Sequence, residues 1–183
     1  MRPNRTDIGT YSGGYFNALE PDPDDIHIED IAHALALTCR WGGHCKQFYS
    51  VAQHSVYVAD YLPDALKLQG LLHDAAEAYI GDVPRPIKHQ MPQFIEIEDN
   101  ILRVIWDKFH LNGYDMHPDV HGVDNMMLNW EASNLLEESH WANNPFPNRP
   151  LNCMSPEDAE ALFLIKFAEI AHDSPYRRRH TAI

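Results

Sequence analysis

Residues 68–84, with the sequence LQGLLHDAAEAYIGDVP, constrain the fold most strongly because, within one and a half turns of an otherwise apolar helix, they place an imidazole and two carboxylates. Apolar residues recur there at three- and four-residue steps, which predicts a buried helix that ends at Gly81. On such a helix, His73 and Asp74 each share a face with Glu77. Burying these groups without partners costs several kcal/mol each. The segment therefore predicts a compensating partner, and a divalent metal ion is the usual partner of histidine and carboxylate side chains.

Helical periodicity also marks the segments on either side of this one. Ser50 and Gln53 have the spacing of a capping box at the start of a helix. Ser155 followed by Pro156 is a typical start for the last helix. The predicted helices span residues 28–40, 50–62, 63–81, 92–109, 120–141 and 155–170. The chain is therefore expected to be all-α, a bundle of about six to eight helices.

The first 27 residues lack this periodicity and contain several glycines and an acidic proline-rich run, EPDPDD. They predict a short irregular N-terminal arm with a hairpin around residues 11–16. Residues 28–172 form the expected domain, and residues 173–183 form the expected C-terminal tail. A chain of 183 residues with 44% hydrophobic content is long enough for one substantial core and too short for two comfortable domains.

Composition excludes several classes of function. The net charge of -13 argues against binding of polymeric DNA or RNA, which depends on lysine and arginine neutralising phosphates. The three cysteines show no C-x-x-C spacing, so they predict reduced thiols and neither a disulfide framework nor a zinc ribbon. An N-terminal signal segment and an apolar run long enough to cross a membrane are both absent. These features predict a soluble cytoplasmic protein without a membrane partner.

Two further residues complete a candidate ligand set for the predicted metal ion. His54 lies on the apolar face of the helix before the His73–Asp74 doublet, and packing of the two helices would bring the histidines together. Asp124 begins the run VDNMML, where a carboxylate precedes an otherwise apolar helical segment. His54, His73, Asp74 and Asp124 are therefore the expected metal ligands.

Four blocks of the sequence carry a resemblance to a known family. In order along the chain they are CRWGGH, FYSVAQHSVYVA, LLHDAAEAYIGDVPRPIK and VDNMML. They resemble the HD-domain phosphohydrolases, and in particular the small HD 5'-deoxynucleotidases and the bacteriophage dATP triphosphohydrolases. The resemblance extends over residues 26–170. It implies an HD-domain helical bundle, a homo-oligomer (dimer or hexamer), and a location in the cytoplasm of a bacterial or phage-infected host cell.

The resemblance also implies roles for individual residues. By this resemblance, His54, His73, Asp74 and Asp124 bind a divalent metal ion. Zn, Co or Mn is preferred, and Mg is a possible additional ion. Glu77 corresponds to the catalytic acid/base, and Asp82 to a residue that positions the nucleotide. Arg40 and Lys88 correspond to phosphate-binding cations. The remaining substrate contacts are expected from Trp41, which packs on the deoxyribose, and from His44, near the pocket entrance.

The implied reaction is hydrolysis at the α-phosphate of a 2'-deoxynucleotide. Arg85, Lys88 and His89 form a small basic cluster that could reach further phosphates. This cluster favours a deoxynucleoside triphosphate substrate, with dATP first and triphosphate as a product. Hydrolysis of deoxynucleoside monophosphates is the alternative, since the same bond is broken. A further alternative is a regulatory module that binds nucleotides without catalysis.

Overall fold

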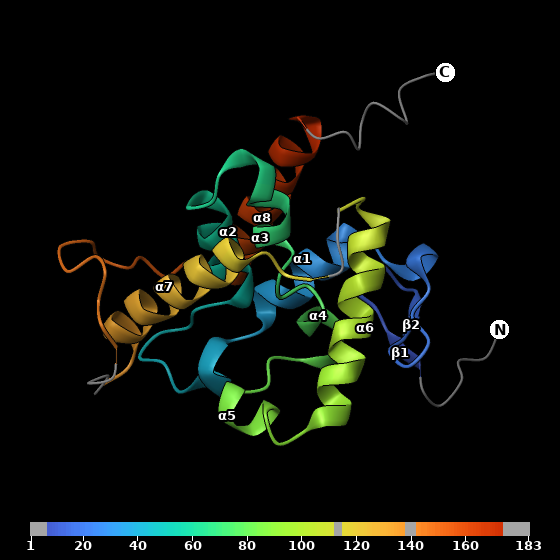
Figure 1. Cartoon of the computed structure of the whole chain (residues 1–183), viewed down its shortest axis with the longest axis horizontal. Coiled ribbons are helices and arrows are strands. Elements are labelled where there is room, and N and C mark those ends of the chain that lie inside the picture. The colour runs from blue at the N-terminus through green and yellow to red at the C-terminus, as the bar shows by residue number, and fades with distance from the viewer. Residues whose placement is uncertain (1–6, 112–114, 138–141, 174–183) are drawn as a thin grey trace.

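The computed structural model describes residues 7–111, 115–137 and 142–173, and in these ranges the protein is built mainly from helices (Figure 1). The all-α expectation is confirmed. No helix within the described ranges is both long and apolar enough to span a bilayer. The elements are β1 (Asp7–Gly9), β2 (Tyr15–Asn17), η1 (Pro23–Asp25), α1 (Ile28–Leu37), η2 (Arg40–Gly43), α2 (Val51–Asp60), η3 (Asp64–Leu66), α3 (Lys67–Leu71), α4 (Glu77–Ile80), α5 (Arg85–Lys88), α6 (Pro92–Lys108), α7 (Pro118–Leu135) and α8 (Pro156–Asp173).

Helix α2 lies at the centre of the molecule, in contact with α1, α3, α7 and α8. Its residues are buried on nearly every side, so His54 is fully inaccessible to solvent although it is polar. The main core joins α1, α2, α4, α6 and α8, whereas a smaller cluster around Trp130 packs α7 against the end of α2. This arrangement holds His54 in a position set by packing from several helices.

The predicted starts of α2 and α8 agree with the structure, whereas several predicted ends do not: α1 ends at Leu37 instead of residue 40, and α8 continues past residue 170 to Asp173. The Ser50 hydroxyl accepts a hydrogen bond from the Gln53 amide at 3.1 Å, as the capping sequence predicts. Helix α8 begins at Pro156. Helix α7 ends at Leu135, before the predicted residue 141. Residues 138–141, and the expected tail from residue 174 onward, lie outside the described residues.

The predicted single helix over residues 63–81 is wrong, because α3 and α4 are separate and the His73–Asp74 doublet lies in the turn between them. The Nδ1 atom of His73 donates to the Gly70 carbonyl at 2.7 Å. In an uninterrupted α-helix that carbonyl would accept from the Asp74 amide, so the imidazole competes with the helix for it. The Glu77 amide instead bonds three residues back, to the Asp74 carbonyl at 3.0 Å. Side-chain chemistry therefore interrupts the helix at the doublet.

The predicted N-terminal hairpin is confirmed: β1 and β2 pair antiparallel, with Ile8 opposite Phe16. The hairpin is tied to the helices by packing and by polar contacts. Phe16 is fully buried and stacks on Tyr79 of α4 with ring centroids 3.8 Å apart. The carboxylate of Asp30 on α1 accepts hydrogen bonds from Ser12 at 2.6 and 2.9 Å. The arm therefore contributes to the same core as the helical domain.

Gly70 is expected to be essential for the close approach of α2 and α3. A Cβ atom at Gly70 would collide with Leu62 Cδ1 and lie 3.4 Å from Ala59 Cα. Leu62 is itself buried in the smaller cluster, so it has little room to move. Gly70→Ala should lower the free energy of unfolding by about 1–3 kcal/mol in a urea titration. Gly122→Ala is the control, because its Cβ meets nothing within 4 Å and should stabilise α7 by about 0.5–1 kcal/mol. Equal effects of the two changes would contradict this account.

Candidate metal centre

Four side chains from three parts of the chain converge beside α2. The Nε2 atom of His54 lies 3.3 Å from His73 Nε2 and 3.1 Å from Asp124 Oδ1. Asp74 Oδ2 lies 3.2 Å from His73 Nε2 and 3.7 Å from His54 Nε2. The ligand atoms of His54, His73 and Asp124 all lie within 4.8 Å of one another, and this group could hold a metal ion. The structure therefore brings together the four residues that the sequence predicts as ligands.

The hydrogen bonds of the two histidines favour a cation at this place. His73 Nδ1 donates to the Gly70 carbonyl, so the neutral ring presents an Nε2 lone pair to the centre. His54 Nδ1 donates to Glu131 Oε1 at 2.7 Å, which leaves its Nε2 in the same state. Two such lone pairs and two carboxylates repel one another unless a proton or a metal ion lies between them. Ligands about 2.0–2.1 Å from one ion in tetrahedral geometry are about 3.3 Å apart, so the observed separations fit a divalent ion.

Without a metal ion, a proton on His54 provides the compensating charge. Burial and Arg40 oppose protonation of His54, but Glu131 and Asp124 raise its pKa to about 9. Burial alone would raise the pKa of Asp74 and Asp124, yet the neighbouring imidazoles lower both pKa values below the ordinary range. Both carboxylates are therefore ionised at neutral pH. Binding of a metal ion must displace the His54 proton.

Glu131 is the residue of this centre that the sequence analysis missed. Its fully buried carboxylate accepts from the Tyr49 hydroxyl and from His54 Nδ1, both at 2.7 Å, and pairs with Arg40 Nε at 3.3 Å. Burial opposes ionisation, but His54 and Arg40 lower the pKa of Glu131. The signal was its position two turns after Asp124 in DNMMLNWE, which places both carboxylates on one face of α7. Glu131 orients a ligand histidine and a buried cation at once.

Glu131→Gln is expected to weaken binding of a divalent ion by about 10–100-fold at pH 9, because loss of such an outer partner lowers ligand basicity and orientation. Competition with a chelator of known affinity would measure the change. The control is Glu137→Gln, since Glu137 is 88% exposed and pairs only with Lys46 among the ion pairs found in the described residues. Far-UV circular dichroism would confirm that both variants fold. Unchanged metal affinity in Glu131→Gln would show that His54 needs no such partner.

Arg40 reaches the metal centre from η2. Its nearly buried guanidinium lies with Nη1 3.7 Å from Asp74 Oδ2. Burial alone would lower the pKa of Arg40, but Glu131 and Asp74 raise it above its ordinary value, so the group stays charged. The Trp41 ring lies 5.1 Å from the Arg40 Cζ atom, and Trp41 adopts a left-handed backbone with φ 53°. His44 follows at the exposed end of η2, on the solvent side.

Glu77 and Lys88 lie next to each other on the side of the centre formed by α4 and α5. Lys88 Nζ lies 3.5 Å from Glu77 Oε1 and 2.7 Å from Glu98 Oε1. Glu77 is buried, and its Oε2 atom has no hydrogen-bond partner among the described residues. Burial, followed by the charges of Asp74 and Asp82, raises the pKa of Glu77 well above its ordinary value. Asp82 is half-buried, and burial also raises its pKa. Burial and the Asp74 charge therefore favour the protonated form of Glu77.

Two cations of the basic cluster that the sequence suggested, Arg85 and Lys88, are paired with acidic groups. Arg85 donates to Asp124 Oδ2 at 3.2 Å and to Asn125 Oδ1 at 3.0 Å, so it covers one ligand of the candidate metal centre. Lys88 is paired with Glu98, as described above. Neither cation faces solvent as an isolated charge. A polyphosphate would have to compete with these carboxylates for both side chains.

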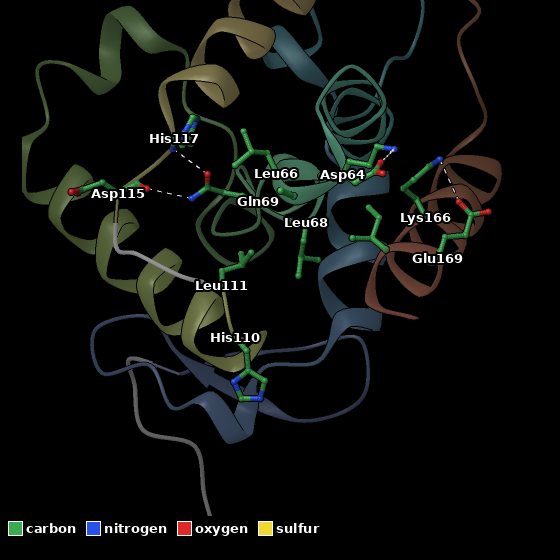
Figure 2. Close-up of a pocket in the computed structure, with 13 residues that line it drawn as sticks. Asp64, Leu66, Leu68, Gln69, His110, Leu111, Asp115, His117, Lys166 and Glu169 are labelled. Carbon is green, nitrogen blue, oxygen red and sulfur yellow. Dashed lines mark hydrogen bonds and ion pairs between the residues drawn. The ribbon is translucent and has the colours of Figure 1, made fainter. Parts of the chain in front are cut away.

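A separate surface cavity of about 650 Å³ is bordered by residues of η3, α3 and α8 (Figure 2). Figure 2 shows Gln69 there, with its side chain bonded to the Asp115 carbonyl and the His117 amide. The cavity is lined by Asp64, Ala65, Leu66, Lys67, Leu68, Gln69, His110, Leu111, Asp115, His117, Lys166, Glu169 and Ile170. None of the predicted site residues is among them. The candidate metal centre is therefore distinct from this cavity.

Comparison with known proteins places the chain among bacterial relatives. No protein-family model matches it. It is 36% identical over 173 residues to "Uncharacterized protein YfdR" of Escherichia coli K12, and the match covers 90% of this chain and 95% of the relative. It is also 37% identical over 110 residues to an uncharacterized protein of Rhodobacter capsulatus, across 55% of this chain and 56% of that one. With a match of that identity and extent to the Escherichia coli protein, the chain belongs to the YfdR family.

Proposed function

We propose that the protein is a metal-dependent phosphohydrolase of the HD-domain class that acts at the α-phosphate of 2'-deoxynucleotides. The observation that carries this proposal is the convergence of two imidazole Nε2 atoms with the carboxylates of Asp74 and Asp124, beside the buried Glu77, whose pKa is raised. The order of the four sequence blocks supports it. Zn, Co or Mn suits a set of two histidines and two aspartates, and the availability of each metal ion determines which one is bound.

The chemistry of the site follows from the residues around the ligands. When bound, a divalent ion polarises a phosphoryl oxygen and acidifies a water molecule. Arg40 supplies a positive charge for a phosphoryl oxygen, because its Nε atom forms an ion pair with Glu131 at 3.3 Å and the other end of the guanidinium lies near Asp74. Glu77 carries a proton that the departing 5'-oxygen of the deoxynucleoside requires. Trp41, adjacent to Arg40, is the proposed support for the deoxyribose.

The number of phosphates on the substrate is the second part of the proposal. The basic residues 85–89 suggest a deoxynucleoside triphosphate, with dATP as the first substrate to test. Arg85 is paired with Asp124 and Lys88 with Glu98, so neither cation is free to bind a second or third phosphate. This pairing favours the alternative substrate, a deoxynucleoside monophosphate. Arg40 alone is sufficient for one phosphate group beside a metal ion.

A substrate panel tests both parts. Purified protein is incubated with dNMPs, dNDPs, dNTPs and the matching ribonucleotides in Zn, Co, Mn or Mg, and products are separated by chromatography. A deoxynucleoside with phosphate, diphosphate or triphosphate is the expected product, and the released anion identifies the substrate class. Intact nucleotides in every reaction would reject catalysis. Calorimetric binding of a deoxynucleotide under those same conditions would then support the non-catalytic regulatory alternative.

A further inference from the structure

Two thiols face each other at the base of the loop that carries Arg40. Cys39 Sγ and Cys45 Sγ are 3.4 Å apart, and the Cys45 thiol also lies 3.7 Å from the Arg40 carbonyl. Both cysteines are free and only partly buried, so a small reagent can reach them. The close approach of two accessible thiols six residues apart in sequence is not explained by core packing.

We propose that Cys39 and Cys45 form an oxidisable dithiol that closes into an intramolecular disulfide when it meets a low-molecular-weight disulfide. A disulfide bond is about 2.05 Å long, so the sulfur atoms have to approach by about 1.4 Å, which is within the reach of side-chain rotation. The bond would close a short ring around residues 40–44.

Backbone hydrogen bonds to other parts of the chain hold both ends of the 39–45 loop in place. Cys39 lies in an isolated antiparallel bridge with Ser50, and the following Arg40 amide donates to the Tyr49 carbonyl at 2.9 Å. On the far side of the loop, the Lys46 amide donates to the Leu135 carbonyl at 2.8 Å. Little conformational entropy is therefore left to lose when the bond forms, which favours closure over reaction with a thiol elsewhere.

The proposed reaction is two successive thiol–disulfide exchanges. The thiolate of one cysteine attacks the external disulfide, forms a mixed disulfide and releases one small thiol. The second cysteine loses its proton, attacks the protein sulfur of that mixed disulfide and releases the second small thiol. The protein dithiol is oxidised by two electrons, and the external disulfide is reduced to two thiols. Burial raises the pKa of the Cys45 thiol to about 11, so closure should become faster as pH rises from 7 to 9.

Cys153 is the competing thiol. It is partly buried, and burial followed by the nearby Cys39 raises its pKa. Because Cys153 is near enough to Cys39 for the two thiols to interact, it is the alternative partner for Cys39. The proposal requires that Cys45 wins this competition because its sulfur atom is already in contact with Cys39 Sγ.

Peptide mapping of the oxidised full-length chain tests the proposal. Reduced protein is exposed to oxidised glutathione, remaining thiols are alkylated, and the monomer band of a non-reducing gel is digested with trypsin. Cleavage after Arg40 and Lys46 separates the two cysteines into peptides 6–40 and 41–46. The expected product is these two peptides joined, about 2 Da lighter than their sum because two hydrogens are lost on oxidation.

Two variants and the wild-type pattern decide the outcome. Cys153→Ser should keep the linked pair, whereas Cys45→Ser should lose it and retain a glutathione adduct. A Cys39–Cys153 link, glutathione adducts without closure, or complete alkylation of all three thiols in the wild-type protein would each overturn the proposal. The wild-type map alone distinguishes these results, so the test does not depend on the folding of either variant. It also does not depend on any catalytic activity.

Discussion

Replacing Glu77 by glutamine is expected to lower kcat for deoxynucleotide hydrolysis by about 10²–10⁴-fold while a divalent ion stays bound. Glutamine has nearly the same shape but no acidic proton, whereas burial and the nearby Asp74 raise the pKa of Glu77 well above its ordinary value and so favour its protonated carboxyl. The deoxynucleoside 5'-oxygen would then depart without a nearby donor. Steady-state kinetics with the best substrate of the panel would measure the loss, and metal analysis of the same sample would give the ion content.

Glu98→Gln is the matched control for this change. Glu98 is partly buried, has a pKa that is likewise raised first by burial, and contacts the same Lys88 Nζ atom at 2.7 Å. It lies on α6, and within the described residues its carboxylate makes no hydrogen bond or ion pair with the ligand atoms of the candidate metal centre, so its loss should lower kcat less than about tenfold. Equal losses in both variants would assign the effect to Lys88. Full activity of Glu77→Gln with metal bound would show that another group supplies the proton.

The helix boundaries could be predicted where a local chemical signal sets them. Ser50 caps α2 and Pro156 starts α8, and both features depend on a few neighbouring residues. The interruption between α3 and α4 could not be predicted in this way, because the residues around His73 keep helical spacing. The break arises when the His73 ring turns back to the Gly70 carbonyl so that its Nε2 atom meets His54. That orientation depends on a helix elsewhere in the sequence.

The residues of the candidate metal centre also fall into those that could be predicted from a local signal and those that could not. His54, His73, Asp74 and Asp124 could be identified because an ionisable residue in an apolar segment stands out in the sequence. Glu131 also lies in such a segment, but its function depends on how α7 lies against α2. Only that packing brings its carboxylate to His54 Nδ1. The packing likewise determines that Arg85, which was predicted as part of a basic cluster for further phosphates, pairs with Asp124.

Binding of a divalent ion to the metal-free protein should weaken about 100-fold as the pH falls from 8 to 6. The pKa of His54 is raised to about 9, so the proton that occupies Nε2 below that pH must leave before an ion can bind. Each pH unit below 9 therefore costs about tenfold in affinity, and the dependence disappears above pH 9. Isothermal titration calorimetry in buffers of different ionisation enthalpy should show about one proton released per ion at pH 7. A flat affinity profile would show that His54 is already deprotonated.

The same titration on Glu131→Gln separates an electrostatic role of Glu131 from a purely structural one. The Glu131 charge helps to raise the pKa of His54, so the variant should bind an ion more weakly at pH 9 but lose less affinity on acidification. The affinity profiles of wild type and variant should therefore converge near pH 6, because a smaller fraction of His54 is protonated in the variant at each pH. Profiles that stay parallel would mean that Glu131 only orients the ring. Glu137→Gln should follow the wild-type profile at every pH, since its exposed side chain lies outside this network.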